Sequence, residues 1–167
     1  MNIEELIDIV DENDTVTGTI ARKDHTHQII RNVVVVLQDS LGYHILQIRS
    51  PLKKRWPGSY DFAACGGVQS KETYEQAAIR ELFEELGVRC SLRLLTKLYR
   101  EVAYDGTIRR HFTCFFHGVY DGEFNPNEEV SGVVKIPPTE FEFMISQRAP
   151  LVEDYLVDEW GIVKKSL

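Results

Sequence analysis

One segment, residues 73–86, has two chemically different faces and constrains the fold more than any other part of the chain. Thr73 and Gln76 form a capping-box pair at its start, and Gly87 is typical of a helix end. At about 100° per residue, the apolar side chains gather on one side, which predicts that this side packs on a core. They are Ile79, Leu82, Phe83 and Leu86. The opposite side carries Glu81, Glu84 and Glu85.

Strand patterns lie on both sides of this helix. The β-branched run Val33–Val36 is typical of a strand that is buried on both faces. Shorter helices are expected from Thr139 and over residues 150–160. The order predicts the α/β class, with a mixed sheet covered by helices on its two faces and a short N-terminal β-hairpin. The expected strands cover 5–10, 15–21, 32–39, 43–49, 61–67, 92–103, 109–120 and 130–136.

The composition narrows the classes of partner. The chain has 167 residues and a net charge of −7, which argues against coating nucleic acid, because a phosphate backbone attracts basic surfaces. No apolar run reaches the roughly 18 residues that a membrane-spanning helix needs, and the acidic N-terminus lacks a signal-peptide pattern. Three cysteines without CxxC spacing fit a reducing compartment. We therefore expect a cytoplasmic protein with no nucleic-acid polymer and no membrane as partner.

The three glutamates of the helix repel one another at this spacing. A solvated acidic face is one interpretation, but such a face usually interleaves lysines, and here only Arg80 lies beside the glutamates. Clustered carboxylates become favourable when a hard divalent cation binds among them. Mg²⁺ takes oxygen ligands and leaves room for phosphate oxygens of a substrate. The helix is therefore a candidate metal site.

The helix lies inside a longer pattern, Gly66-x5-Glu72-x7-Arg80-Glu81-Leu82-x-Glu84-Glu85-x-Gly87-Val88. This pattern resembles the signature of the Nudix hydrolase family at every fixed position. The resemblance implies a Nudix-type α/β/α sandwich in which residues 66–88, the Nudix box, form loop–helix–loop. It also implies a single Nudix domain over 1–167, with residues 1–28 as an N-terminal hairpin extension.

The family resemblance implies hydrolysis of a diphosphate linkage with Mg²⁺, for which Mn²⁺ can substitute. Carried over by position, the metal ligands are Glu81, Glu84, Glu85 and the carbonyl of Gly66. Arg80 resembles the arginine that orients these carboxylates, and Glu72 resembles a positioning group. The catalytic base varies in the family; here the candidates are a box glutamate, Glu128 or Glu129. Dimers are common among such proteins, so the resemblance allows a homodimer.

Basic residues before the box are candidates for binding the substrate. Arginine makes bidentate contacts to phosphate, and lysine acts as a point charge. Arg49, Lys53 and Arg55 are therefore candidates for binding the phosphate that is not transferred, and the alternative is a loop whose charges only aid solubility. The expected partner is a small organic diphosphate, either a nucleoside diphosphate derivative or another one.

A closer resemblance gives a rival function. Residues 56–67 are similar to the segment that enters the box in isopentenyl diphosphate isomerases, where Cys65 matches a catalytic cysteine. Two histidine ligands of those isomerases are replaced here by Gly67 and Ile30, which argues against a double-bond isomerase. A non-catalytic domain that binds a diphosphate ligand is the third alternative, although its expected sign is a broken box.

Overall fold

The computed structural model describes residues 5–104 and 106–167. Its elements follow the expected order closely, with the strand pattern continuing on both sides of one long helix. The strands are β1 Leu6–Val10, β2 Val16–Ala21, β3 Ile29–Gln38, β4 His44–Arg49, β5 Tyr60–Phe62, β6 Ala64–Gly67, β7 Leu92–Tyr104, β8 Thr107–Val119 and β9 Val130–Ile136. The helices are η1 Arg22–Asp24, α1 Tyr74–Leu86, α2 Pro138–Ser146 and α3 Asp154–Val163.

The strands form one mixed sheet around β3. Strand β8 runs parallel to β3 over its whole length, while β6 pairs with β3 in the antiparallel sense. Strands β5 and β9 pair with β4, and β7 extends the sheet beyond β8. Because β4 pairs with β3 only at residues 37–38, the two strands diverge, and β5 pairs with β4 while β6 pairs with β3.

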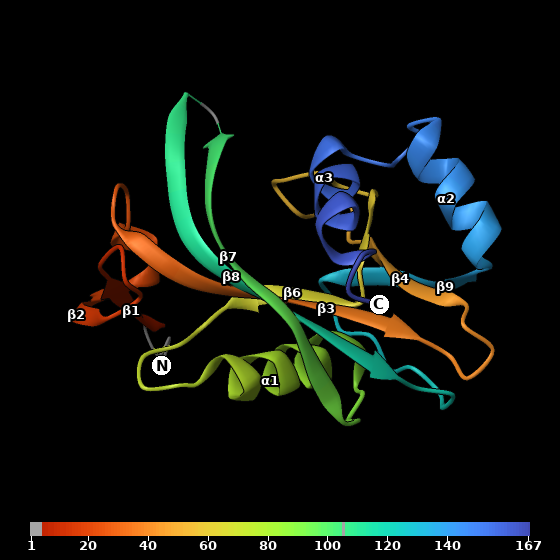
Figure 1. Cartoon of the computed structure of the whole chain (residues 1–167), viewed down its shortest axis with the longest axis horizontal. Coiled ribbons are helices and arrows are strands. Elements are labelled where there is room, and N and C mark those ends of the chain that lie inside the picture. The colour runs from red at the N-terminus through yellow and green to blue at the C-terminus, as the bar shows by residue number, and fades with distance from the viewer. Residues whose placement is uncertain (1–4, 105) are drawn as a thin grey trace.

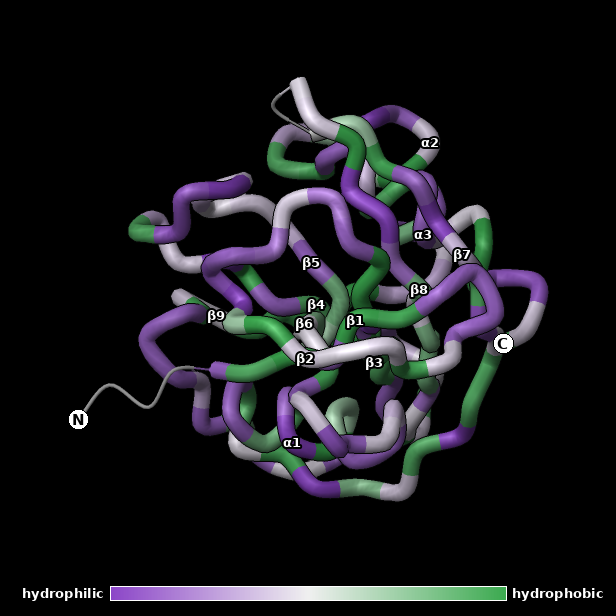
Figure 2. The backbone as a smooth tube through the Cα atoms, turned by 90° about the vertical axis from the view of Figure 1, so that its left-hand side faces the viewer, coloured by the Kyte–Doolittle hydropathy of each residue, from purple (hydrophilic) through white to green (hydrophobic). Residues whose placement is uncertain are grey.

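Helices cover both faces of the sheet, as predicted. Figure 1 shows α1 on one side and α2 with α3 on the other, and Figure 2 shows the same layers from the edge. Alternate residues of β3 divide between two cores, with Val33 and Val35 packing toward α1 and Val34 and Val36 toward α3. The prediction that this run is buried on both faces is confirmed.

Helix α1 has the predicted ends but a different buried face. The Thr73–Gln76 capping box is present, and Gly87 adopts the left-handed conformation. However, Phe83 is 45% exposed, with the guanidinium of Arg89 lying 4.0 Å from its ring centroid. Glu81 and Glu85 are buried instead. The prediction that only the apolar side of the helix is buried was wrong, because the loop before the helix and the end of β6 cover the acidic side as well.

Two other boundaries differ from the sequence prediction. The single strand expected over 61–67 is interrupted at Ala63, so that β5 pairs with β4 and β6 pairs with β3. The last helix starts four residues later than expected, because Leu151 adopts a left-handed backbone conformation with φ of 69°. Leu151 is consequently exposed rather than part of the apolar face.

The N-terminal hairpin is formed by β1 and β2, which pair in the antiparallel sense. Residues 1–4 of the predicted 1–28 extension lie outside the described residues. The hairpin leads through η1 to β3 and so brings Arg22 to the edge of the Nudix box. Among the residues that the structure describes, no helix is long and apolar enough to span a membrane.

A buried histidine makes the fold sensitive to acid. His44 is 3% exposed and lies 4.6 Å from the Phe141 ring and 4.9 Å from the Trp160 ring, between centroids. Burial lowers its pKa to about 4. Below pH 6.5 the unfolded chain binds a proton that the folded chain excludes, so stability falls as pH drops from 6.5 to 4.

Through His44, the wild type is expected to lose about 2–3 kcal/mol of its free energy of unfolding between pH 7 and pH 4.5. The His44→Phe variant should not show this part of the acid loss. Denaturant unfolding at the two pH values measures this difference. His27→Gln is the control, because His27 is exposed. An equal acid loss in wild type and His44→Phe would contradict the prediction.

Candidate active site

A small acidic pocket of about 360 Å³ lies between α1, the end of β6 and the turn before β9. It brings together most of the residues that the sequence assigned to metal binding and catalysis. These are Gly66, Arg80, Glu81, Glu84, Glu85 and Glu129.

Arg80 organises the acidic side of α1. It forms a two-pronged ion pair with Glu72, at 2.8 and 2.9 Å. Its Nη1 also donates to Glu81 at 2.8 Å and to Glu84 at 3.1 Å, and its Nη2 donates to the carbonyl of Gly67 at 2.9 Å. Neighbouring carboxylates raise the pKa of Arg80 above its ordinary value, although burial opposes this. The guanidinium therefore stays charged and fixes the loop to the helix.

Glu85 is buried and is held by two uncharged donors. The side-chain amide of Gln47 donates to its Oε2 at 2.8 Å, and the backbone N–H of Cys65 donates to the same oxygen at 3.3 Å. Burial, together with the nearby Glu81 and Asp61, raises the pKa of Glu85 to about 8. A cation next to this carboxylate would stabilise its charged form.

Gly66 is packed directly against Glu81. A Cβ atom at position 66 would overlap the carboxylate of Glu81, so only glycine leaves this carboxylate beside the backbone of β6. Burial also raises the pKa of Glu81. Among residues 5–104 and 106–167, no three His, Cys, Asp or Glu side chains already form a closed metal cluster, since Glu81 and Glu84 turn toward Arg80.

These observations fit a divalent cation with oxygen ligands. The donors are carboxylates and a backbone carbonyl, which hard cations prefer. The glycine at 66 leaves room for a cation to approach the backbone of β6 closely. The two groups that bind the buried Glu85 are uncharged and do not compensate its charge. Glu84 is half exposed and is bound to Arg80 by one hydrogen bond, so it can turn toward a cation by a change of rotamer.

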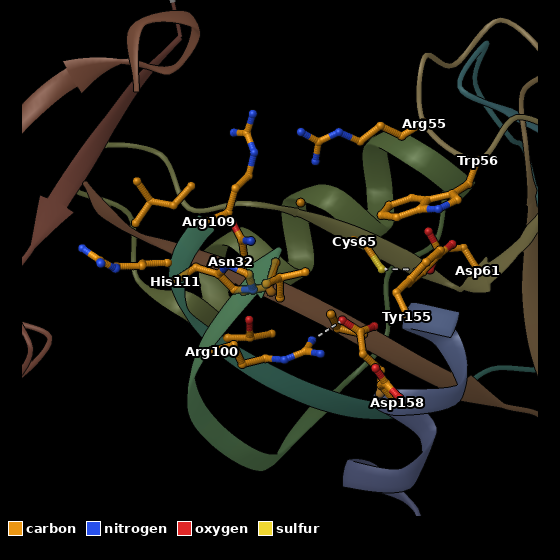
Figure 3. A pocket seen from close by; sticks show the side chains of 18 of the residues that line it. Asn32, Arg55, Trp56, Asp61, Cys65, Arg100, Arg109, His111, Tyr155 and Asp158 are labelled. Carbon is orange, nitrogen blue, oxygen red and sulfur yellow. Dashed lines mark hydrogen bonds and ion pairs between the residues drawn. The ribbon is translucent and has the colours of Figure 1, made fainter. Parts of the chain in front are cut away.

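A second cavity of about 960 Å³ opens on the α3 side of the sheet. Figure 3 shows Asn32 and His111 on one side of it and Cys65, Asp61 and Tyr155 on the other. Its basic lining residues outnumber its acidic ones, which suits an anionic ligand. The basic residues are Arg22, Arg49, Lys53, Lys54, Arg55, Arg100, Arg109 and Arg110, and the acidic ones are Asp61, Glu101, Glu153, Asp154, Asp158 and Glu159.

The two cavities meet at Cys65 and Gly66. Within the described part of the chain, two cationic side chains line both of them, Arg22 from η1 and Lys53 from the β4–β5 loop. Sequence reasoning identified Lys53 but missed Arg22, because no local motif marks it and only the hairpin fold carries it to the box. Arg22 forms an ion pair with Glu5 at 2.7 Å, and its guanidinium carbon would lie 3.2 Å from a Cβ at Gly67.

The predicted substrate-binding residues lie in different places. Lys53 forms an ion pair with Glu129 at the acidic pocket. Arg49 is bound to the buried Asp61 at 2.9 Å and to the carbonyl of Arg55, so it anchors the loop at the cavity wall. Arg55 lines the large cavity. Glu128 is exposed and is not one of the described residues that line either cavity.

Trp56 is a wall residue to which the sequence gave no firm role. Its backbone is left-handed, with φ of 46°, a conformation that costs free energy for a large side chain. The buried Ser59 holds it there by donating to the carbonyl of Trp56 at 2.7 Å. The indole packs on Tyr155 of α3, with ring centroids 4.2 Å apart. The loop therefore joins α3 to the cavity.

The fold is that of an α/β protein in which a carboxylate-lined helix lies beside a second cavity whose lining suits a small anionic ligand. Comparison with known proteins identifies the family. The model of the NUDIX domain matches residues 28–155, and the chain belongs to the Nudix hydrolase family, whose members cleave diphosphate linkages in general.

Individual relatives and structures agree with this assignment. A Nudix hydrolase of Deinococcus radiodurans is 35% identical over 133 residues, which cover 77% of each chain. An isopentenyl-diphosphate Delta-isomerase of Streptomyces coelicolor is 34% identical over 81% of this chain and 72% of its own. The crystal structure of DR0079 from Deinococcus radiodurans superposes with a TM-score of 0.77 at 29% identity, covering 97% of this chain and 99% of that one.

Proposed function

We propose that the protein is a divalent-metal-dependent hydrolase that cleaves the diphosphate linkage of a small organic diphosphate, with Mg²⁺ as the metal and Mn²⁺ as a substitute. The observation that carries the proposal is the junction of the two cavities. There the acidic pocket of the Nudix box meets a basic cavity large enough for an organic group, at Cys65 and Gly66. A diphosphate at this junction would have carboxylates on one side and Arg22 and Lys53 on the other.

In this proposal Glu81, Glu84, Glu85 and the carbonyl of Gly66 hold the metal. When bound, the metal would neutralise phosphate charge and lower the pKa of a water molecule that attacks phosphorus. Arg80 holds Glu81 and Glu84 in place through its contacts to Glu72 and Gly67. For the base, we favour Glu129 over Glu128, because Glu129 lines the acidic pocket.

The decisive experiment is a hydrolysis panel. Nucleoside, sugar, dinucleotide and isoprenoid diphosphates are incubated with the protein and Mg²⁺, Mn²⁺ or EDTA, and the phosphate or monophosphate product is measured. We expect metal-dependent cleavage of at least one class. Tight binding of a diphosphate without cleavage under all conditions would overturn the proposal in favour of a non-catalytic binding domain.

Arg22 and Lys53 are expected to contribute binding energy to the diphosphate. Arg22→Gln should raise KM about tenfold while kcat changes less than about threefold, because a charge-assisted hydrogen bond to phosphate acts in both the ground state and the transition state. Lys53→Gln should raise KM similarly, but it should also change kcat, because Lys53 forms an ion pair with Glu129. Steady-state kinetics at low salt measures both parameters.

Arg89→Gln is the matched control, since Arg89 is an exposed arginine that packs on Phe83 away from both cavities. Thermal melting checks that Arg22→Gln leaves the hairpin folded after it loses its ion pair with Glu5. Unchanged KM in a folded Arg22→Gln protein would show that the diphosphate does not reach η1.

The isomerase remains the second candidate, because a relative named as an isomerase aligns with most of the chain and Cys65 lies at the junction. Burial and the neighbouring Asp61 raise the pKa of the Cys65 thiol, which would keep it protonated as an acid. Against this reading, Arg22 fills the space that a side chain at Gly67 would need, and Ile30 lines the cavity. Deuterium uptake into isopentenyl diphosphate, dependent on Cys65, would favour the isomerase.

A further inference from the structure

The floor of the large cavity is built by neighbouring strands on the face of the sheet that α3 covers. Asn32 of β3 lies beside Thr113 of β8, two residues along the strands from the pair formed by Ile30 and His111. His111 also lies beside Arg100 of β7. Because side chains alternate along a strand, Asn32, Thr113 and His111 share one face of the sheet. Figure 3 shows Asn32 and His111 next to each other in the cavity.

Within the described residues, two polar side chains of this floor have no hydrogen-bond partner in the protein. Thr113 is 1% exposed, and its Oγ1 has no hydrogen-bond partner within the described part of the chain. Buried hydroxyls normally have partners, since an unsatisfied one costs folding free energy. The carboxamide of Asn32 likewise makes no hydrogen bond to residues 5–104 and 106–167. Two adjacent side chains thus offer donors and acceptors to the cavity.

The third polar group of the floor is uncharged as well. Burial, with a smaller contribution from Arg100, lowers the pKa of His111 to about 4. Its imidazole is therefore neutral near pH 7 and presents one donor and one acceptor. Two arginines near this floor have their charges compensated: Arg100 is paired with Glu159 at 2.6 Å and Arg110 with Glu101 at 3.3 Å. The centre of the floor suits a polar group without charge.

We propose that Asn32 and Thr113 determine which substrates the protein selects. Their side chains hydrogen-bond an uncharged polar group of the ligand that has a donor next to an acceptor. This group belongs to the organic moiety of the diphosphate, which lies in the large cavity. A hydrocarbon chain at the same place would satisfy neither side chain, and so it binds more weakly than a moiety that hydrogen-bonds both. This inference rests on the proposed function, to which it adds the selection of the organic group.

The test separates binding of the organic group from binding of the two phosphates. Isothermal titration calorimetry with Mg²⁺ compares three non-hydrolysable probes: methylenebisphosphonate, α,β-methylene-UDP and the geranyl ester of methylenebisphosphonate. The gain in affinity of each ester over methylenebisphosphonate itself reports on the large cavity alone. The variants are Thr113→Val and Asn32→Leu, which keep the side-chain shape and remove the polar groups. Thr17→Val is the control, because Thr17 is exposed on β2.

We expect the wild type to bind the uridine probe at least about tenfold more tightly than methylenebisphosphonate, and each variant to reduce this gain about threefold to tenfold. Binding of methylenebisphosphonate should be unchanged. Thr113→Val should melt at the same temperature as the wild type or higher, because it removes an unsatisfied buried hydroxyl. If Thr113 were needed only for folding, this variant would melt lower instead.

Three results would overturn the inference: a larger gain for the geranyl probe than for the uridine probe, a uridine gain that both variants leave intact, or equal weakening of all three probes. Efficient cleavage of isoprenoid diphosphates would do the same while leaving the proposed diphosphate hydrolase in place. Failure of methylenebisphosphonate to bind with Mg²⁺, together with no cleavage of any diphosphate, would overturn both.

Discussion

Replacing Glu85 by glutamine is expected to abolish hydrolysis while leaving the protein folded. Glutamine keeps the carbonyl oxygen that accepts from Gln47 and from the N–H of Cys65, but it loses the charge that would bind a divalent cation. We expect kcat to fall by at least about 10³-fold, equivalent to about 4 kcal/mol of transition-state stabilisation. Product release with Mg²⁺ in excess measures this change. Glu84→Gln should have a similar effect.

The matched control is Glu75→Gln, which removes an exposed carboxylate from the first turn of the same helix and should leave kcat unchanged.

The thermal stability of Glu85→Gln gives a second readout. Because burial raises the pKa of Glu85 from 4.5 in the unfolded chain to about 8 in the folded one, metal-free wild type loses stability as pH rises through this range. Glu85→Gln should therefore melt no lower than wild type at pH 8. Normal turnover by this variant would refute the site.

The second large effect is expected from Gly66→Ala. The added methyl group would occupy the position of the Glu81 carboxylate, and because that carboxylate ends a flexible side chain, it would move rather than the backbone. We expect at least a 100-fold loss of kcat/KM, about 3 kcal/mol, with a melting temperature close to that of the wild type. Kinetics over a range of Mg²⁺ concentrations should show weaker metal activation.

Gly161→Ala is the control for this substitution, because a Cβ at position 161 of α3 meets open space. Full activity of Gly66→Ala would show that the contact between Gly66 and Glu81 has no part in catalysis. Unfolding of Gly66→Ala would show that the backbone of β6 yields before the carboxylate does.

The sequence predicted the elements well where local signals are strong. The capping box at Thr73, the left-handed Gly87 and the β-branched run of β3 each act within a few residues, and each is found as expected. The break at Ala63 has no such local signal, because it depends on two different partner strands. The exposure of Phe83 was also not predictable from periodicity. Both the apolar and the acidic side of α1 are covered by other parts of the fold, whereas the periodicity indicated burial of the apolar side alone.

The candidate site shows the same division. The box residues are close in sequence, so one helix and one loop place them together, and their spacing was sufficient to find them. Arg22 and Thr113 lie far from the box in the sequence. Each is a common residue type in an ordinary turn or strand, so no local motif marks either of them as part of a site. Only the pairing of β1 with β2 and of β3 with β8 brings them to the junction and the floor.

The origin of the two cavity walls has an evolutionary consequence. The carboxylates come from α1, whereas the polar floor comes from side chains of β3, β7 and β8 on the opposite face of the sheet. Substitutions confined to these floor side chains would leave the carboxylates of α1 in place. A duplicated gene could acquire a new ligand preference through two or three strand substitutions while inheriting its chemistry intact.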